Sequence, residues 1–262
     1  MRIAVCIKQV PDTAEIRIDP VKHTLIRDGV PSIVNPYDLN ALEAAVRLKE
    51  QHGGQVTAVS MGPPAAAKAL KECLARGADE AVLVTDRAFG GSDTYATSYI
   101  LASAIRHLGP FDLILCGKQA IDGDTGQTGS SMSTHLGIPQ LTYALEIQVA
   151  GDTVKVKREV EEGVMLLSAR MPALITVGKD INVPRYPGIR SKLESYKAQV
   201  TLLACQDMPE IDTEKIGLKG SPTRVKKTFT PDVKKQGLRV SGAGVQTAID
   251  GLTEYLAGQH LL

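Results

Sequence analysis

The chain has 262 residues, 43% of them hydrophobic, and a formal net charge of +1 at pH 7. A chain of this size can bury a full core in one large domain with an appendage, and its near-neutral charge predicts no general preference for acidic or basic partners. It contains no tryptophan and only three phenylalanines, which argues against an aromatic base-stacking surface, so nucleic acid is not an expected partner.

The four cysteines are widely spaced and form no CxxC pair, which predicts neither a metal site nor a disulfide framework. No apolar run reaches the length of a membrane span, and the short apolar stretch at the N-terminus does not fit a signal peptide. We therefore expect a cytoplasmic protein without membrane insertion.

Strand-like and helix-like segments alternate along the first 140 residues. In chain order they are a strand at 3–7, a helix at 40–51, a strand at 55–61, a helix at 65–75, a strand at 80–84, a helix at 94–107, a strand at 111–116 and a segment at 130–136 that can be helical. Repetition every 25 to 30 residues or so is typical of successive βαβ units. It predicts a doubly wound α/β fold with a mostly parallel sheet, whose ligand should lie outside the carboxyl ends of the strands.

The loop at 117–129 is the most specific feature of this half of the chain. It is rich in glycine and polar residues, follows a buried strand and precedes a helix-like segment, so it can present unpaired backbone amides to a phosphate or pyrophosphate. The polar segments 8–12, 35–38, 60–64 and 89–94 are expected at the same edge of the sheet. Neither GxxxxGK[ST] nor GxGxxG after the first strand occurs, so we expect a mono- or diphosphate nucleotide held by amides.

Several residues in these segments also have simpler interpretations. Asp38 and Asp93 suit ordinary helix N-caps, and Lys8, directly after a strand, is more typical of a solvated strand end. Asp122 and Asp124 could bind magnesium or could repel the terminal phosphates of a triphosphate. A cap requires one polar residue, however, and the run of polar residues in the loop favours ligand binding.

After about residue 143 the apolar pattern changes from helical spacing to alternation. Residues 145–149 and 153–158 flank a turn and predict a β-hairpin, and residues 164–169 and 173–177 predict further strands. We interpret all of these strands as an antiparallel hairpin extension of the same domain.

The remainder of the chain predicts a helix at 191–197, a basic, proline-punctuated arm at 215–239 and a C-terminal helix over 244–261 with one apolar face. The predicted domains are 1–214, an α/β nucleotide-binding domain with the hairpin extension, and 215–262, the basic arm with the C-terminal helix. We expect that helix to pack across a subunit boundary, because the arm offers it little of its own domain to cover its apolar face.

Several segments resemble the β subunit of electron-transfer flavoproteins, whose adenine-nucleotide-binding fold is similar to that of universal stress proteins. They occur in the same order over nearly the whole chain, at 5–12, 35–38, 43–49, 60–63, 77–79 and 117–128. The segment 117–128 is highly specific to that family.

The resemblance implies an αβ heterodimer in which the α subunit holds a redox FAD and the β subunit binds an adenine nucleotide. That nucleotide is AMP in simple carriers, which pass electrons from dehydrogenases to a quinone reductase, and a second FAD in electron-bifurcating members. In the bifurcating branch, NADH is the electron donor, and the electrons pass to the α-subunit FAD and to a low-potential acceptor such as ferredoxin or flavodoxin. By motif match, the nucleotide-binding residues are Cys6, Asn35, Tyr37, Asp38, Met61, Gly117, Gln119, Asp122, Gly123, Thr125, Gly126, Gln127 and Thr128.

Residues 91–98 resemble the segment that distinguishes the bifurcating branch. Asp93, Thr94 and Thr97 are expected there to receive the second half of a pyrophosphate, because a dinucleotide needs more donors than a monophosphate. We therefore expect FAD in this subunit, with AMP as the alternative. No catalytic side chain is expected, since the redox chemistry belongs to the cofactor.

The segment 182–189 is similar to the family's loop for docking acyl-CoA-type dehydrogenases. The resemblance assigns Arg185, Tyr186 and Ile189 to docking, and Ile189 stands near the position of an apolar anchor that is usually leucine. An alternative of another class is a universal-stress-type nucleotide-sensing module, which would bind ATP and need neither a flavin nor an α subunit.

Overall fold

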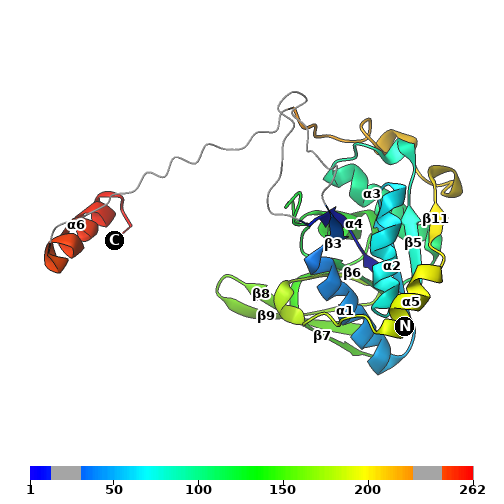
Figure 1. The fold of residues 1–262 in the computed structure, drawn as a ribbon, viewed down its shortest axis with the longest axis horizontal. Helices are drawn as coiled ribbons and strands as arrows, with labels where there is room; N and C mark the ends of the chain where they lie inside the picture. Colours follow the sequence, from blue (N-terminus) through cyan, green and yellow to red (C-terminus); the bar gives the residue numbers. More distant parts are fainter. Residues whose placement is uncertain (13–30, 227–243, 262) are drawn as a thin grey trace. The chain divides into compact units, whose positions relative to one another are not determined.

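The computed structural model describes residues 1–12, 31–226 and 244–261 (Figure 1). They belong to two compact units, one containing residues 1–12 and 31–226 and the other containing residues 244–261. Residues 227–239 of the predicted basic arm lie outside the described residues. Within the described ranges, every helix is too short or too polar to cross a lipid bilayer.

A nine-stranded sheet forms the centre of the larger unit, in the order β11-β5-β4-β1-β6-β10-β7-β8-β9. Its strands are β1 (Arg2–Cys6), β4 (Gln55–Met61), β5 (Glu80–Val84), β6 (Leu113–Gly117), β7 (Gln140–Ala150), β8 (Thr153–Val160), β9 (Gly163–Arg170), β10 (Ala173–Val177) and β11 (Thr201–Leu203). Neighbouring strands from β11 to β7 are parallel, whereas β7, β8 and β9 pair antiparallel. Most residues of β1, β4, β5, β6 and β10 are buried, because helices cover both faces of this part of the sheet.

The helices of this unit lie on both sides of the sheet. They are α1 (Pro36–His52), α2 (Ala67–Ala75), α3 (Thr94–Leu108), α4 (Thr128–Leu136) and α5 (Ile189–Lys197), with short 3-10 turns at Pro64–Ala66, Arg87–Phe89, Lys179–Ile181, Cys205–Asp207 and Thr213–Lys215. Ile3 and Val5 of β1 share one core with α1 and α2, visible over one face of the sheet in Figure 1. Ala4 and Cys6 share the other core with α3 and α4.

A separate two-stranded sheet returns the chain to the end of β1. It pairs β2 (Gln9–Pro11) antiparallel with β3 (Ser32–Val34). This pairing places Asn35 beside Lys8, whose carbonyl accepts the Asn35 amide at 2.9 Å. The long excursion after the first strand therefore begins and ends at the same edge of the large sheet.

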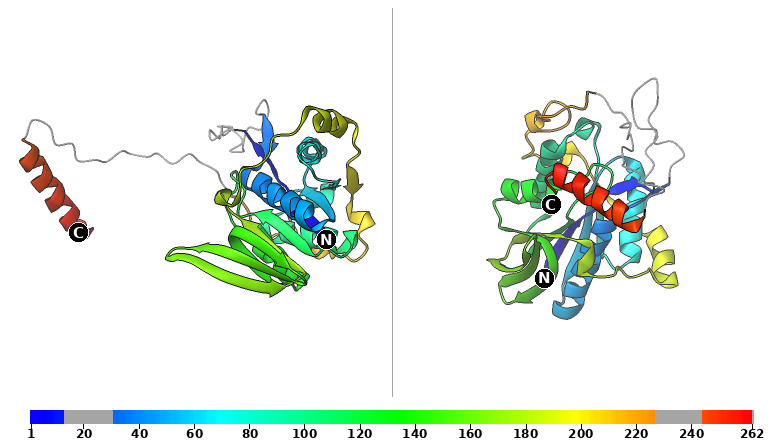
Figure 2. Two further views of the ribbon diagram at one scale, coloured as in Figure 1. Left: turned by 90° about the horizontal axis from the view of Figure 1, so that it is seen from below. Right: turned by 90° about the vertical axis from the view of Figure 1, so that its left-hand side faces the viewer.

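The structure confirms the predicted α/β fold with a mostly parallel sheet, and β4 and β5 have the predicted bounds. Two local expectations were wrong. Helix α1 begins at Pro36 instead of residue 40, because a proline suits the first helical position, so residues 35–38 start the helix. Strand β10 runs parallel between β6 and β7, and the antiparallel extension consists of β7, β8 and β9 alone (Figure 2).

The second unit contributes α6 (Val245–Gly258), where the sequence predicted a helix over 244–261. Its large apolar side chains recur at helical spacing and are exposed; they are Val245, Ile249, Leu252 and Tyr255. An apolar stripe of this kind on a water-exposed helix is typical of a surface that packs against another element.

Candidate functional site

The carboxyl ends of β1, β4, β5 and β6 lie at one edge of the sheet, because these four neighbouring strands are parallel. The segments that follow them meet at this edge, and α1, α3 and α4 begin there. Hydrogen bonds join the predicted site residues of 35–38 to those of 117–121, whereas Asp93, Thr94 and Thr97 stand at the start of α3, which follows β5 at the same edge. The predicted docking residues lie elsewhere, in the segment that passes α1 and α2.

Asn35 joins the start of α1 to the loop 117–129. Its side-chain amide donates to the carbonyl of Gln119 at 2.9 Å, and its side-chain oxygen accepts the amide of Ile121 at 3.2 Å. Asn35 is completely buried. A buried side-chain amide that satisfies two backbone groups of a loop fixes that loop in one conformation.

Asp38 holds the ends of β1 and β6 together. Its carboxylate accepts the Lys8 amide at 2.7 Å and the Gly117 amide at 3.1 Å. Burial raises the pKa of Asp38 to about 7, although the bonds from Lys8, Asn35 and Gly117 oppose this shift. Gly117 must be glycine, because a Cβ there would lie 2.6 Å from the Cβ of Tyr37. Asp38 is therefore a buried acceptor that joins β1 to β6, and it is not the N-cap that the sequence allowed.

The two acids of the loop 117–129 already have partners within the chain. Lys8 Nζ lies 2.6 Å from Asp122 Oδ1, and Gln119 Nε2 donates to Asp124. Lys8 is exposed, as expected of a strand end, and its ammonium group also pairs with Asp122. Among the described residues, no group of three or more histidine, cysteine or acidic side chains is placed to hold a metal ion.

The loop ends in an exposed turn that leads into α4. Gly126 has a φ of 63°, a left-handed conformation that glycine adopts without strain. Thr125 and Gln127 are exposed, and no described side chain caps the first turn of α4 at Gln127 or Thr128. The first amides of α4 are thus open to an outside acceptor. A Cβ placed on Gly123 would meet only the Lys8 ammonium group, at 3.9 Å.

Cys6 and Cys116 form the floor beneath this edge. They are neighbours in the register of β1 and β6, and both are buried. The hydrogen bond with Cys6 and burial raise the pKa of the Cys116 thiol, so Cys116 stays protonated. Met61 at the end of β4 packs against the same core. Cys6 and Met61 can offer only their limited exposed surface to a ligand.

Asp93 caps α3 and also holds a distant part of the chain. One carboxylate oxygen accepts the Ala96 amide at 3.0 Å, and the other accepts the Thr223 amide at 2.9 Å and its hydroxyl at 2.7 Å. Burial opposes ionisation, but these bonds hold the pKa of Asp93 below its ordinary value. The N-cap interpretation is confirmed, and the carboxylate joins α3 to the segment around Ser221, whose hydroxyl accepts the Asp93 amide at 2.9 Å.

Helices α3 and α4 pack against each other, with the last turn of α4 beside the first turns of α3. His135 of α4 meets the rings of Tyr95 and Tyr99 edge-on, with centroids 5.2 and 5.5 Å away. Burial lowers the pKa of His135, and the charges of Arg106 and Lys215 add to this effect. Thr94 and Thr97 are partly exposed on the first turns of α3. On α1, the ring of Tyr37 forms a cation–π contact with Lys118, whose Nζ lies 5.5 Å from the ring centroid.

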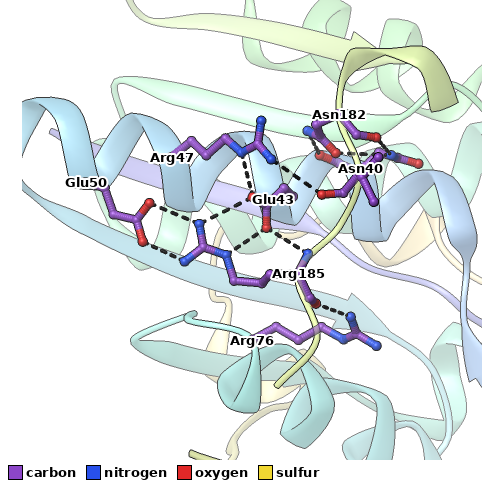
Figure 3. Close-up of polar contacts among 8 residues, drawn as sticks. Asn40, Glu43, Arg47, Glu50, Arg76, Asn182 and Arg185 are labelled. Atoms are coloured by element: carbon purple, nitrogen blue, oxygen red, sulfur yellow. Dashed lines mark hydrogen bonds and ion pairs between the residues drawn. The ribbon is translucent and has the colours of Figure 1, made fainter. Parts of the chain in front are cut away.

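The three predicted docking residues differ in their surroundings. Tyr186 and Ile189 are 90% and 85% exposed. Arg185 instead points to α1, where it contacts Glu43 and Glu50 (Figure 3). Its guanidinium is therefore occupied within its own chain.

Sequence reasoning missed four residues that shape these regions: Asn40, Glu43, Glu50 and Thr223. The first three stand at helical spacing on α1, where polar side chains interrupt an otherwise apolar helix, and that pattern was a usable signal. Thr223 carried no such signal, because its contact with Asp93 joins residues far apart in the sequence.

Comparisons with known proteins agree with this architecture. A family model described as the electron transfer flavoprotein domain matches residues 22–207. The electron transfer flavoprotein subunit beta of Clostridium acetobutylicum is 53% identical over 237 residues, covering 90% of this chain and 91% of that protein. The subunit beta of Thermoanaerobacterium thermosaccharolyticum is 49% identical over the full length of both chains. Subunit CarD of the caffeyl-CoA reductase-Etf complex of Acetobacterium woodii is 44% identical, also over the full length of both.

The chain therefore belongs to the electron transfer flavoprotein family. Within that family, the similar proteins from Clostridium and Thermoanaerobacterium are β subunits, which makes electron transfer the general role of this chain. This membership favours the electron-transfer interpretation over a universal-stress-type sensing module.

Proposed function

We propose that this chain is the β subunit of an αβ electron transfer flavoprotein and that it binds FAD at the carboxyl edge of its sheet. The observation that carries the proposal is the open first turn of α4, at the end of an exposed glycine-rich loop. Unpaired amides at a helix N-terminus, together with the positive end of the helix dipole, favour a phosphate.

The charges around α4 suit a nucleotide of limited charge. Asp122 is neutralised by Lys8, and Asp124 accepts from Gln119, so neither acid stands alone against a phosphate. Both acids still lie in the loop, where they disfavour the extra charge of a triphosphate. The residues proposed to line the phosphate are Gly123, Thr125, Gly126, Gln127 and Thr128.

The neighbouring start of α3 supports FAD, because a dinucleotide needs donors beyond those of one loop. Thr94 and Thr97 place hydroxyl groups at the first turns of α3, which packs on α4 through His135. Their hydroxyls would hold the second half of the pyrophosphate. Asn35, Tyr37 and Asp38 would shape the adenosine side of the site from the start of α1.

One observation favours the alternative ligand, AMP. The Asp93 carboxylate already accepts the Ala96 amide, and the Asp93 carbonyl accepts the Thr97 amide. Part of the α3 N-terminus is therefore used within the chain, which suits a monophosphate held by α4 alone. With AMP, the chain would be the structural subunit of a carrier that passes electrons from dehydrogenases to a quinone reductase.

A flavin in this site would supply hydride acceptance from NADH and the division of the electron pair between the α-subunit FAD and ferredoxin or flavodoxin. The contribution of this chain is to bind and orient that cofactor at the carboxyl edge, where Cys6 and Cys116 are buried. We place this activity in the cytoplasm.

Two exposed apolar surfaces supply the proposed protein contacts. The stripe on α6 would pack on the α subunit. Tyr186 and Ile189 would dock an acyl-CoA-type dehydrogenase. The similar CarD protein, by its name, is part of a caffeyl-CoA reductase-Etf complex, which supports a partner that acts on acyl-CoA compounds.

Purification of the αβ complex tests the proposal, followed by separate measurement of flavin and AMP per heterodimer. Two flavins and no AMP are expected. One flavin with one AMP would reject the FAD assignment and support the alternative, and a colourless chain that never binds an α subunit would reject both.

The double substitution Thr94→Val and Thr97→Val sharpens the measurement. It should lower the flavin content toward one per heterodimer, because both hydroxyls of the proposed pyrophosphate site are removed. Thr134→Val is the matched control, since the Thr134 hydroxyl on α4 donates to Ser130 within its own helix at 3.2 Å. The control should retain both flavins.

A further inference from the structure

The segment 182–188 is held to the molecule by its backbone. The carbonyl of Asn182 accepts from Asn40 Nδ2 at 2.8 Å, that of Val183 accepts from Arg47 Nη2 at 3.4 Å, and that of Arg185 accepts from Arg76 Nη1 at 2.5 Å. Side chains of α1, and of Arg76 at the end of α2, therefore donate hydrogen bonds to three carbonyls within four consecutive residues. Figure 3 shows these contacts converging on one short stretch of chain.

The side chain of Arg185 adds further contacts between this segment and α1. Its Nε donates to Glu43 Oε2 at 2.8 Å, while Nη1 and Nη2 donate to the two oxygens of Glu50 at 2.6 and 3.0 Å. The Arg185 backbone amide also donates to Glu43 Oε2, at 3.1 Å. A planar guanidinium that faces two carboxylates at once is a geometry that lysine cannot reproduce.

Glu43 requires Arg185 to stay in this position, because the Glu43 side chain is buried, with 4% of its surface exposed. Burial alone would raise the pKa of Glu43, but the hydrogen bonds from Arg185 and Arg47 outweigh burial and hold that pKa below its ordinary value. A buried carboxylate is stable only while its cationic partners stay in place. Any movement of Arg185 away from α1 would therefore be opposed.

The apolar side chains of the same segment point the other way. Val183, Tyr186 and Ile189 are each more than four-fifths exposed, whereas Arg185 between them is directed inward. The segment thus makes its contacts with α1 and α2 on one side and exposes its apolar side chains on the other. We call Asn40, Glu43, Arg47, Glu50 and Arg76, with Arg185, the brace.

We propose that Arg185 is a positioning residue: the brace holds Tyr186 and Ile189 in the conformation that a dehydrogenase partner binds, and Arg185 itself does not contact that partner. This inference rests on the docking role proposed above. A segment that is already ordered spares the complex the entropy of ordering it on binding, and that saving appears as a lower KM for the partner.

The αβ complex is tested with a purified short-chain acyl-CoA dehydrogenase that is reduced by its acyl-CoA, and KM and kcat for that dehydrogenase are measured. Arg185→Lys should raise KM about fivefold to tenfold and Glu50→Gln, at a half-exposed partner, about twofold to fivefold, with kcat nearly unchanged. These factors correspond to losses in preorganisation of about 1 to 1.4 and about 0.4 to 1 kcal/mol. Both variants leave Glu43 with a cation, so the fold is retained.

Amide hydrogen exchange of the full-length chain without any partner provides a second measurement. Exchange over residues 182–188 should become faster in both variants, because the carbonyls and amides of the brace open more often. Arg190→Gln is the matched control. It removes one arginine charge from the same region, but Arg190 pairs with Glu194 in an exposed contact outside the brace, so neither exchange nor KM should change more than about twofold.

Ile189→Ala and Tyr186→Ala separate this inference from the docking proposal. If they raise KM while Arg185→Lys and Glu50→Gln leave it unchanged, docking stands and the positioning role of Arg185 is overturned. Unchanged exchange in the brace variants would also overturn it. If Ile189→Ala and Tyr186→Ala both leave KM unchanged, the docking role fails and this inference fails with it.

Discussion

Two carboxylates on α1, Asp38 and Glu43, lie five residues apart and have opposite electrostatic behaviour. Both are nearly fully buried. Asp38 accepts two backbone amides, and burial raises its pKa to about 7. Burial acts on Glu43 too, but Arg185 and Arg47 lower its pKa below the ordinary value. The difference shows that burial decides the protonation state of a carboxyl group unless the chain supplies a cation beside it.

The two regions around these residues are consequently suited to different tasks. The brace around Glu43 is a compensated ionic cluster that keeps its charges over the physiological pH range. The carboxyl edge around Asp38 is held by a group that titrates near neutrality and by backbone bonds. The brace can therefore hold a segment rigidly, while the carboxyl edge combines a buried acid that titrates near neutrality with the exposed ion pair of Lys8 and Asp122.

The largest expected effect comes from removing the acceptor at the carboxyl edge. Asp38→Ala should lower the free energy of unfolding by about 3 kcal/mol, because the amides of Lys8 and Gly117 both lose their buried acceptor. Asp38→Asn keeps one acceptor oxygen and should cost about half as much. Urea denaturation of the full-length chain measures both. An alanine variant as stable as the wild type would show that the hydrogen bonds to Asp38 do not stabilise the fold.

The pH dependence of stability should distinguish the two carboxylates by sign. The pKa of Asp38 is higher in the folded chain, so its contribution to stability is greatest at low pH and falls as pH rises from about 4 to about 7. The pKa of Glu43 is lower in the folded chain, so its contribution is present above its unfolded pKa of 4.5 and is lost as pH falls through the folded value.

Denaturation curves of three proteins across pH 3.5 to 8 test these signs. The stability difference between wild type and Asp38→Asn should be largest at about pH 4 and should shrink as pH rises to about 7, because the raised pKa of Asp38 stabilises the folded chain only while the carboxyl group is protonated. The difference between wild type and Glu43→Gln should shrink as pH falls below about 4.5. Parallel pH curves for the two variants would contradict the comparison.

Within the brace, Glu43→Gln at neutral pH should lower the free energy of unfolding by about 2 kcal/mol. The substitution puts a neutral amide group in the buried position where Arg185 and Arg47 now meet a carboxylate. Glu50→Gln is the control, because the Glu50 side chain is 53% exposed and its loss should cost less than about 1 kcal/mol. Equal costs would show that the burial of Glu43 adds nothing.

The smallest effect on stability is expected at the exposed ion pair of the carboxyl edge. Lys8→Met should change the free energy of unfolding by less than about 0.5 kcal/mol, because Lys8 is 47% exposed. It should nevertheless weaken AMP binding about threefold to tenfold, since Asp122 would be left unneutralised beside the phosphate. Calorimetric titration with AMP measures this, and the further substitution Asp122→Asn should restore the affinity.

Local sequence patterns were enough to predict most of the sheet and helices. Strands β4 and β5 are short, mostly apolar segments rich in valine and alanine and bounded by glycine or polar residues, so their ends were predictable. The start of α1 was missed because the apolar repeat begins at Leu42, whereas the first turn contains Pro36 and the buried Asp38. A polar first turn on the inner side of a site does not follow the periodicity that identifies a helix.

The candidate site was predictable as a set of segments, but not as a set of contacts. Parallel strands bring their following loops to one edge, which placed residues 35–38 and 117–128 together before any contact was known. The bond from Gly117 to Asp38 and the ion pair of Lys8 with Asp122 join residues far apart in the sequence, and no local pattern encodes such pairs. The orientation of Arg185 depends likewise on carboxylates of another element.

The position of β10 has a consequence for how the chain is made. β10 lies between β6 and β7, although β7, β8 and β9 all precede it in the chain. During synthesis, β6 and β7 therefore cannot join the same sheet until β10, which pairs with both of them, has been made. Until residues 173–177 emerge, the apolar edge of β6 is unpaired and the finished hairpin has no sheet to join, which is the interval in which a nascent chain is most exposed to wrong strand partners.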